Sequence, residues 1–199
     1  FGEFPESAWI ENTREALNKP GEWLLDRKEQ RIYIWPEGDR PGSGITAPAL
    51  TEIIRIEGKI DYEGPKDTPV LGVRFTGLTF TQADRFTWQK NRIGWGVQHD
   101  WEMFDRPTAM VRLRGAENCG IVDCHLMNTG AAGIRLDLHC QKNIISKNKI
   151  EHLGGVGILL CGYGPGTKDV NRENKVVRNH IEPISMLRRA QALPTGFGM

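Results

Sequence analysis

Apolar and polar residues alternate in short segments that return every 23 to 24 residues through the second half of the chain. Residues 111–114 (VRLR), 134–137 (IRLD) and 158–161 (ILLC) begin 23 and then 24 residues apart. Alternation with a period of two is typical of a β-strand with one buried face. A fixed repeat of this length is typical of a solenoid, in which each repeat covers the hydrophobic face of the next. We therefore predict an all-β chain folded as a parallel β-helix.

The alternation also predicts which side chains share a column when the repeats stack. Six apolar residues should point inward, namely Val111, Leu113, Ile134, Leu136, Ile158 and Leu160. The intervening residues should form two outward columns, one with Arg112, Arg135 and Leu159 and one with Arg114, Asp137 and Cys161. Residues 54–57 (IRIE) fit the same register upstream and add Glu57 to the second column.

Asparagines recur at the turns between strands. Asn118, Asn143 and Asn174 precede the second strand of successive repeats, and Asn148 and Asn179 align with Cys124. Asparagine tolerates left-handed backbone and bonds nearby amides, so this recurrence predicts stacked asparagine ladders. Residues 73–78 are expected to align with residues 121–126 in the same way.

The chain divides into three parts by pattern. Residues 1–50 predict a short helix from Asn12 to Leu17 and a β-hairpin of residues 23–26 and 31–35. This unit is too small to hold a core alone, and we expect it to pack on the solenoid. Residues 51–184 form the coils, with a Trp-rich insertion at residues 81–109. Residues 185–199 read as a tail or cap, and further coils of a longer native chain are expected.

Several segments resemble bacterial right-handed parallel β-helix proteins of the pectate-lyase-like superfamily. The similarity lies in residues 17–26 (LNKPGEWLLD) and 32–36 (IYIWP), and also in residues 77–80, 130–134 and 162–167. Many of these proteins are carbohydrate-active, with glycoside hydrolases prominent. The resemblance implies a right-handed solenoid that hydrolyses glycosidic bonds of a plant or algal polysaccharide, in a secreted or periplasmic location.

Composition limits the partners. With 26 basic and 25 acidic residues the net charge is +1, which gives no long-range attraction to nucleic acid or an anionic membrane. No apolar run approaches the roughly 18 residues of a membrane span. The chain opens with Phe1 and shows no signal peptide. A polysaccharide or oligosaccharide remains the expected partner.

Glycoside hydrolysis generally needs two carboxyl groups, one acting as an acid and one as a base or nucleophile. The outward column offers Asp137 and Glu57 as the catalytic pair, with Arg114 between them. Arg112, Arg135 and His139, which follows Asp137 by two, are predicted to bind substrate with Arg114. An ordinary salt-bridge ladder on a solvated face is the alternative.

Aromatic residues supply further candidates, because sugar rings pack their C–H faces on aromatic side chains. In the insertion, Trp95, His99, Asp100 and Trp101 are predicted to contact substrate, and Asp100, Glu102 or Asp105 could supply the second carboxylate. Tyr163, in the Gly-rich segment 162–167, is predicted to do the same.

Two other functions remain open. A polysaccharide lyase would need a Lys or Arg base beside uronate and often Ca²⁺; otherwise no cofactor or metal is expected. A non-catalytic carbohydrate-binding or adhesion solenoid is the second. The four cysteines match no zinc pattern and are expected to be buried free thiols, with a disulfide between coils as the alternative.

Overall fold

The structure is a computed structural model that describes residues 12–64, 66–85, 105–163 and 167–184. The described part is almost all β, with parallel sheets and no α-helix. The chain separates into two compact units, residues 1–47 and residues 48–199.

The first unit contains the predicted hairpin. Strand β1 (Trp23–Asp26) pairs antiparallel with β2 (Arg31–Ile34). The predicted helix is a single 3-10 turn, η1 (Arg14–Ala16), with Thr13 and not Asn12 as its N-cap. The Asn12 side chain instead bonds both the N–H and the carbonyl of Leu25, at 2.9 and 3.1 Å.

The second unit consists of three parallel sheets. The first sheet contains β3 (Ile54–Glu57), β4 (Val70–Leu71), β7 (Ala109–Glu117), β10 (Ala132–Gln141), β13 (Ile158–Cys161) and β14 (Asn171–Arg172). The second contains β5 (Arg74–Thr76), β8 (Gly120–Val122), β11 (Ile144–Ser146) and β15 (Lys175–Val177). The third contains β6 (Thr79–Ala83), β9 (His125–Thr129), β12 (Lys149–Leu153) and β16 (His180–Ile184).

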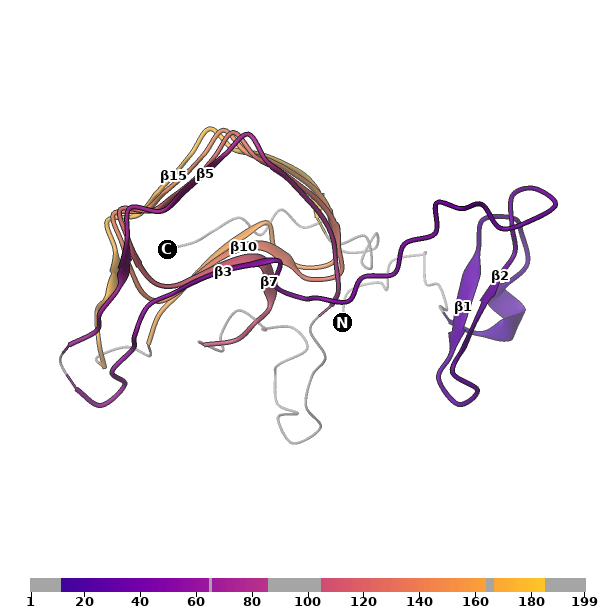
Figure 1. Ribbon diagram of the computed structural model, residues 1–199, viewed down its shortest axis with the longest axis horizontal. Helices are drawn as coiled ribbons and strands as arrows, with labels where there is room; N and C mark the ends of the chain where they lie inside the picture. The colour runs from indigo at the N-terminus through magenta and orange to yellow at the C-terminus, as the bar shows by residue number, and fades with distance from the viewer. Residues whose placement is uncertain (1–11, 65, 86–104, 164–166, 185–199) are drawn as a thin grey trace, which may run out of the picture. The chain divides into compact units, whose positions relative to one another are not determined.

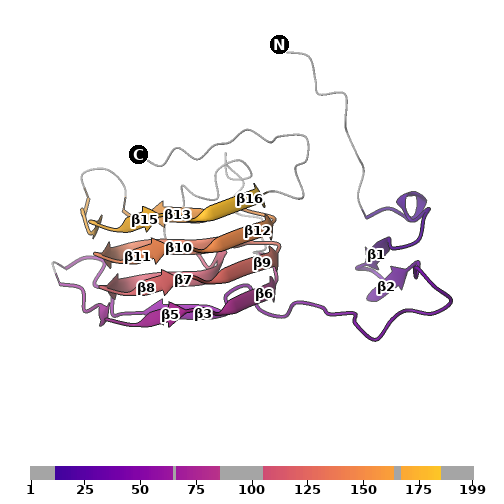
Figure 2. The ribbon, with the colours of Figure 1, turned by 90° about the horizontal axis from the view of Figure 1, so that it is seen from above.

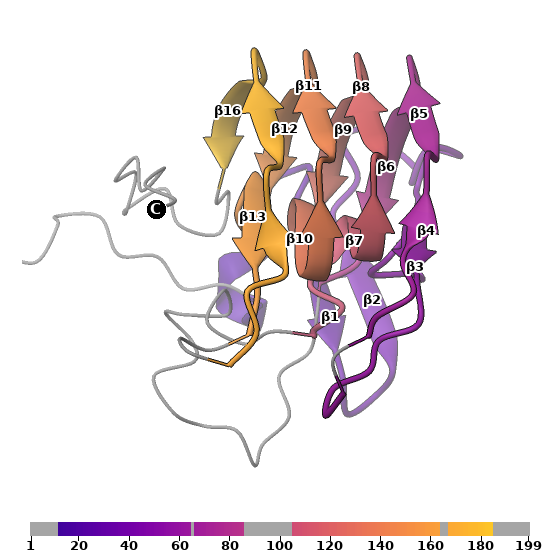
Figure 3. The same cartoon turned by 90° about the vertical axis from the view of Figure 1, so that its left-hand side faces the viewer.

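The described residues pass through the three sheets in the same order four times. We call each passage a circuit: circuit 1 contains β3–β6, circuit 2 β7–β9, circuit 3 β10–β12 and circuit 4 β13–β16. Figure 1 looks along the stacked circuits, and Figures 2 and 3 show equivalent strands of successive circuits lying side by side. The core lies between the three sheets and is lined by the apolar side chains of every circuit.

The predicted columns are confirmed in register. Ile134 pairs with Val111 and with Ile158, and Arg114 pairs with Glu57 and with Asp137. Inner side chains of circuits 2 and 3 are fully buried, and each such burial contributes about 1.5–3 kcal/mol. Leu160, the equivalent residue of circuit 4, is 47% exposed because β13 has β10 on one side and no described strand on the other.

One asparagine ladder is confirmed, and in the other Asn143 and Asn174 are confirmed while Asn118 is displaced by one residue. Asn148 accepts a hydrogen bond from the N–H of Cys124 at 2.9 Å, and Asn179 accepts from Asn148 at 3.0 Å, as predicted. In the other ladder the position below Asn143 belongs to Cys119, whose N–H donates to Asn143 at 2.9 Å. Asn118 was therefore placed wrongly; it takes the preceding left-handed position, with φ 52°.

The predicted alignment of residues 73–78 with residues 121–126 is wrong by two positions. Phe75, and not Val73, pairs with Ile121. Val73 and Phe75 are both apolar and differ by one period of the strand alternation, so a slip of two keeps the same face inward. The left-handed turn settles the register, because Gly77 (φ 68°) then aligns with Asp123 (φ 54°).

All four cysteines are buried and none of them forms a disulfide, which confirms the expectation of buried thiols. Burial raises the pKa of the Cys140 thiol to about 12. A thiol held in its protonated form is a poor nucleophile.

Candidate functional site

The outward columns are buried at Asp137, Arg112 and Arg135 and exposed at Glu57. Asp137 is fully buried beneath the segment that leads into β7. Its carboxylate accepts hydrogen bonds from the backbone N–H groups of Asp105 (2.9 Å) and Arg106 (3.2 Å). It also accepts from Arg112 Nη2 and Arg135 Nε, both at 2.8 Å. Asp137 therefore has donors from four residues around one carboxylate.

The two arginines that hold Asp137 are buried as well and bond other protein groups. Arg112 donates to Asp105 Oδ1 at 2.6 Å and lies 3.4 Å from Glu52 Oε1. Arg135 donates to Thr108 Oγ1 at 2.7 Å. The substrate-binding roles predicted for Arg112 and Arg135 and the catalytic role of Asp137 stay predictions. Their surroundings suit side chains that fix the segment before β7.

A more exposed charged group lies beside this buried one, around Arg114. Arg114 Nη1 bonds Glu57 Oε1 at 3.0 Å, while Nε and Nη2 bond the two oxygens of Asp105 at 2.6 and 3.0 Å. Tyr62 accepts from Arg114 Nη2 at 2.6 Å and its hydroxyl donates to Asp105. The side chains of Glu57 and Tyr62 are both more than 40% exposed. Two carboxylates and a phenol therefore meet one guanidinium group at the surface.

This setting keeps Asp105 ionised. Burial by itself would raise the pKa of the Asp105 carboxyl, but hydrogen bonding and charge attraction from Arg114, reinforced by Arg112, hold the pKa below its usual value. The same contact with Asp105 raises the pKa of Arg114. The pair is therefore charged at neutral pH.

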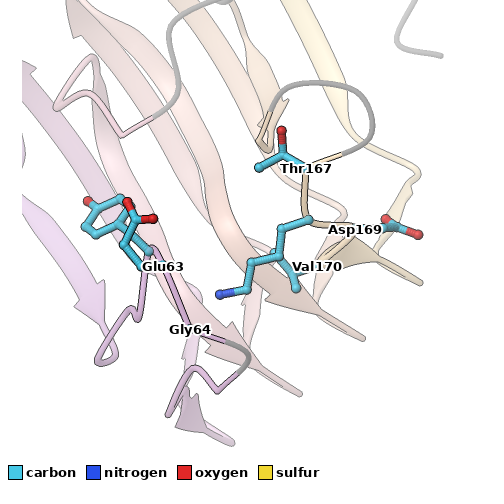
Figure 4. A pocket seen from close by; sticks show the side chains of 7 residues that line it. Glu63, Gly64, Thr167, Asp169 and Val170 are labelled. Atoms are coloured by element: carbon cyan, nitrogen blue, oxygen red, sulfur yellow. The ribbon is translucent and has the colours of Figure 1, made fainter.

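An open cleft of about 550 Å³ lies next to this group, between two segments that we call its walls. The first wall is residues 58–64 and 66–69, between β3 and β4, and the second is residues 162–163 and 167–170, between β13 and β14. The cleft is lined by Tyr62, Glu63, Gly64, Thr167, Lys168, Asp169 and Val170. Figure 4 shows Glu63 and Gly64 on one side and Thr167 and Val170 on the other, with the Asp169 carboxylate turned away from Glu63.

Both walls leave the first sheet at the same place in their circuits. Glu57 pairs with Arg114 and Val70 with Ala116, so the whole first wall corresponds to Gly115 alone in circuit 2. The left-handed backbone of Gly115 (φ 74°) would strain any other residue, and its close approach to Gly58 leaves little space for a Cβ atom. The walls of circuits 1 and 4 thus flank two circuits without such insertions.

Aromatic side chains connect the cleft to the charged group. Tyr62 lines the cleft and bonds Arg114 and Asp105. Its ring meets the edge of the Tyr163 ring, with centroids 6.4 Å apart. Lys168 Nζ lies 5.5 Å from the centroid of Tyr163. Tyr163, predicted to bind substrate, is thus next to the cleft.

A second charged cluster includes one residue from each wall, Asp67 and Lys168. His139 faces Asp67 Oδ2 through Nδ1 at 3.0 Å and Glu117 Oε1 through Nε2 at 2.7 Å. Asp67 also accepts from Lys168 Nζ at 3.0 Å and from the N–H of Asp61 at 2.8 Å. Burial would raise the pKa of Asp67, but these three donors lower it. His139 is therefore tied to protein groups on both ring nitrogens.

The structure brings together some of the predicted residues and adds others. Glu57, Arg114 and Asp137 meet around Asp105, which was one of three carboxylates suggested from the insertion. Trp95, His99, Asp100 and Trp101 lie outside the described residues. Sequence reasoning missed Tyr62, Asp67, Glu117 and Lys168, which long-range strand pairing brings to the site.

Within the described residues no group of three or more His, Cys, Asp and Glu side chains is placed to hold a metal ion. A search of that same part of the chain found no helix of the length and hydrophobicity needed to cross a membrane.

Comparisons with protein-family models, with curated proteins and with solved structures found no match to this chain.

Proposed function

We propose that the chain is a right-handed parallel β-helix that binds a saccharide in the cleft between its walls and hydrolyses a glycosidic bond there. Support for the solenoid comes from the four circuits, their in-register parallel pairing and the asparagine ladders. In-register neighbours of this kind lie about 4.8 Å apart. The resemblance to bacterial β-helix proteins supports the same assignment.

The observation that carries the functional proposal is that Tyr62 lines the cleft and also hydrogen-bonds Asp105 and Arg114. The cleft volume falls within the 300–1,000 Å³ typical of small-ligand sites. An exposed phenol ring offers an apolar face for a sugar and a hydroxyl at its rim. A saccharide packed on Tyr62 would lie beside two carboxyl groups.

The geometry around Arg114 suits a pair of carboxyl groups with different roles. Glu57 and Asp105 bond different edges of one planar guanidinium group, which sets their carboxyl carbons on the order of 7 Å apart. Inverting glycosidases hold their two carboxyl groups about 6.5–9.5 Å apart. Asp105, kept ionised by Arg114, is the proposed base that activates water. Glu57 is the proposed acid once it has released Arg114 and Arg55 and bound the proton that it delivers to the leaving oxygen. Asp137 fixes the backbone of Asp105 and is assigned a positioning role.

The test is a reducing-sugar assay on a panel of plant and algal glycans, with and without EDTA. We expect hydrolysis by the wild type, and a loss of about 10²–10⁴-fold in Glu57→Gln and in Asp105→Asn, because each removes one acid–base partner. Glu182→Gln is the matched control; this exposed carboxylate on β16 bonds His180 and should leave activity unchanged. Full activity in both Glu57→Gln and Asp105→Asn would overturn the assignment.

A non-catalytic saccharide-binding solenoid is the second candidate, and the sealed environment of Asp137 favours it. It predicts that glycans bind without turnover and that Tyr62→Ala weakens binding. The lyase alternative would also release reducing ends, and it would be distinguished by the ultraviolet absorbance of an unsaturated product whose formation EDTA prevents.

A further inference from the structure

His139 stands between two carboxylates that come from different circuits. Asp67 belongs to the first wall and Glu117 to β7, and the His139 side chain is only 11% exposed. An imidazole ring protonated on both nitrogens donates to both oxygens, whereas a neutral ring donates to one and turns a lone pair toward the other. Both observed contacts are therefore satisfied by the imidazolium form.

Asp67, the partner of His139, also joins the two walls. It accepts from the Asp61 N–H in the first wall and from Lys168 in the second, and the Asp67 side chain is 1% exposed. Lys168 returns a hydrogen bond to the Asp61 carbonyl at 2.8 Å. Asp61 directly precedes Tyr62, so this bonding also places Tyr62 in the cleft.

We propose that His139, through Asp67, is a positioning residue that holds the two walls of the cleft together, and that loss of its second ring proton loosens them. The proposal rests on the proposed function only in taking this cleft as the saccharide site. In the described part of the chain, two titratable groups face His139 directly: Asp67 from the first wall and Glu117 from β7. Lys168 and Tyr163 of the second wall interact with Asp67 on its other side.

The direction of the pH effect follows from these groups. The lowered pKa keeps Asp67 ionised, and an imidazolium ring donates to Asp67 and to Glu117 at once. When the ring becomes neutral, one carboxylate meets a lone pair and turns away. The walls should therefore stay joined while the ring carries both protons.

Amide hydrogen exchange measured residue by residue on the whole protein tests this without any saccharide. The reporters are the N–H groups of Asp61 and Thr68, which bond Asp67 and the Lys59 carbonyl at 2.8 Å. In the wild type we expect their protection factors to fall roughly tenfold or more between pH 5.5 and 8.5, which brackets the ordinary titration of imidazole, because a charge-assisted bond is lost. His139→Gln, which donates to one carboxylate at every pH, should show reduced protection and no pH step.

His125→Gln is the matched control, because His125 pairs with Glu151 at 2.7 Å in the third sheet and should keep the wild-type pH step. Asp67→Asn should lower protection of Asp61 at both pH values. A wild type without a pH step, or a His139→Gln variant with the wild-type step, would overturn the proposal. Because no sugar is present, such a result leaves the assay of glycan hydrolysis unaffected and is read separately from it.

Discussion

The carboxylate of Asp137 is enclosed by two buried guanidinium groups and two backbone N–H groups. Such a buried ionic group is stable only while each charge has its partners. Asp137 balances Arg112 and Arg135, and Asp105 adds a second negative charge at Arg112. Removing the charge of Asp137 alone would leave two guanidinium groups buried with too little opposite charge.

Asp137→Asn should therefore lower the free energy of unfolding by about 3–5 kcal/mol, the usual cost of breaking a buried ion pair from one side. Urea denaturation followed by circular dichroism measures this loss. Glu182→Gln, at an exposed pair on β16, should stay within about 0.5 kcal/mol of the wild type. An unchanged urea midpoint in Asp137→Asn would contradict the positioning role.

At this scale the sequence predicted the residues of the outward column but not their surroundings. Alternation placed Glu57, Arg114 and Asp137 in one row, because strand period determines which residues share a face. Burial of that row depends on the segment before β7, whose path no local pattern specifies. The positions of Tyr62 and Lys168 could not be predicted for a similar reason, since each lies in a wall outside the repeat.

At the scale of elements, asparagine amides bond one circuit to the next. Asn148 is almost fully buried; it accepts from Cys124 and donates through Nδ2 to the carbonyl of Ile121 at 3.0 Å and to Asn179 at 2.9 Å. These bonds satisfy backbone groups at a corner where the sheets do not. The ladder therefore supports three successive circuits at one turn.

Asn148→Ala should cost at least about 2 kcal/mol, because it leaves the Cys124 N–H and the Ile121 carbonyl buried without partners, each worth roughly 1–3 kcal/mol. Asn179→Ala is the comparison, since Asn179 lies at the end of the ladder and is partly exposed. Thermal or urea unfolding should show the larger loss in Asn148→Ala. Equal losses in the two variants would argue against the ladder as a buried support.

The register of a strand was predictable where two independent sequence features, the apolar alternation and a turn residue, gave the same alignment. Cys124, Asn148 and Asn179 aligned correctly because apolar alternation and a turn residue agreed. Phe75 was misplaced because alternation alone tolerates a slip of two residues, and Gly77 was not recognised as the left-handed turn position.

For the whole molecule, carboxylates with lowered pKa values link stability to pH. The described residues include five, namely Glu22, Asp26, Asp67, Asp105 and Glu151. A carboxyl whose folded pKa lies below its unfolded value stabilises the fold above the unfolded pKa of about 4. That contribution is lost as pH falls through the folded pKa.

We therefore expect the urea midpoint to hold steady from neutral pH down to about pH 5 and to fall below about pH 4. Asp105→Asn should be less stable than the wild type at pH 7 and should lose less on acidification, because one of the linked carboxyl groups is gone. Denaturation series at pH 7, 5 and 3 measure both effects. A midpoint at pH 3 equal to that at pH 7 would contradict the linkage.

The position of the two walls has a consequence for the evolution of this surface. They rise from β3 and β13, which are separated by β7 and β10 in the first sheet. With about 4.8 Å between neighbouring strands, their bases are roughly 14 Å apart. Gaining or losing one internal circuit would change this width by a single strand spacing. The distance between the walls can therefore change only in discrete steps, by duplication or deletion of about two dozen residues. Point substitutions alter the chemistry of the walls and leave the distance between them unchanged.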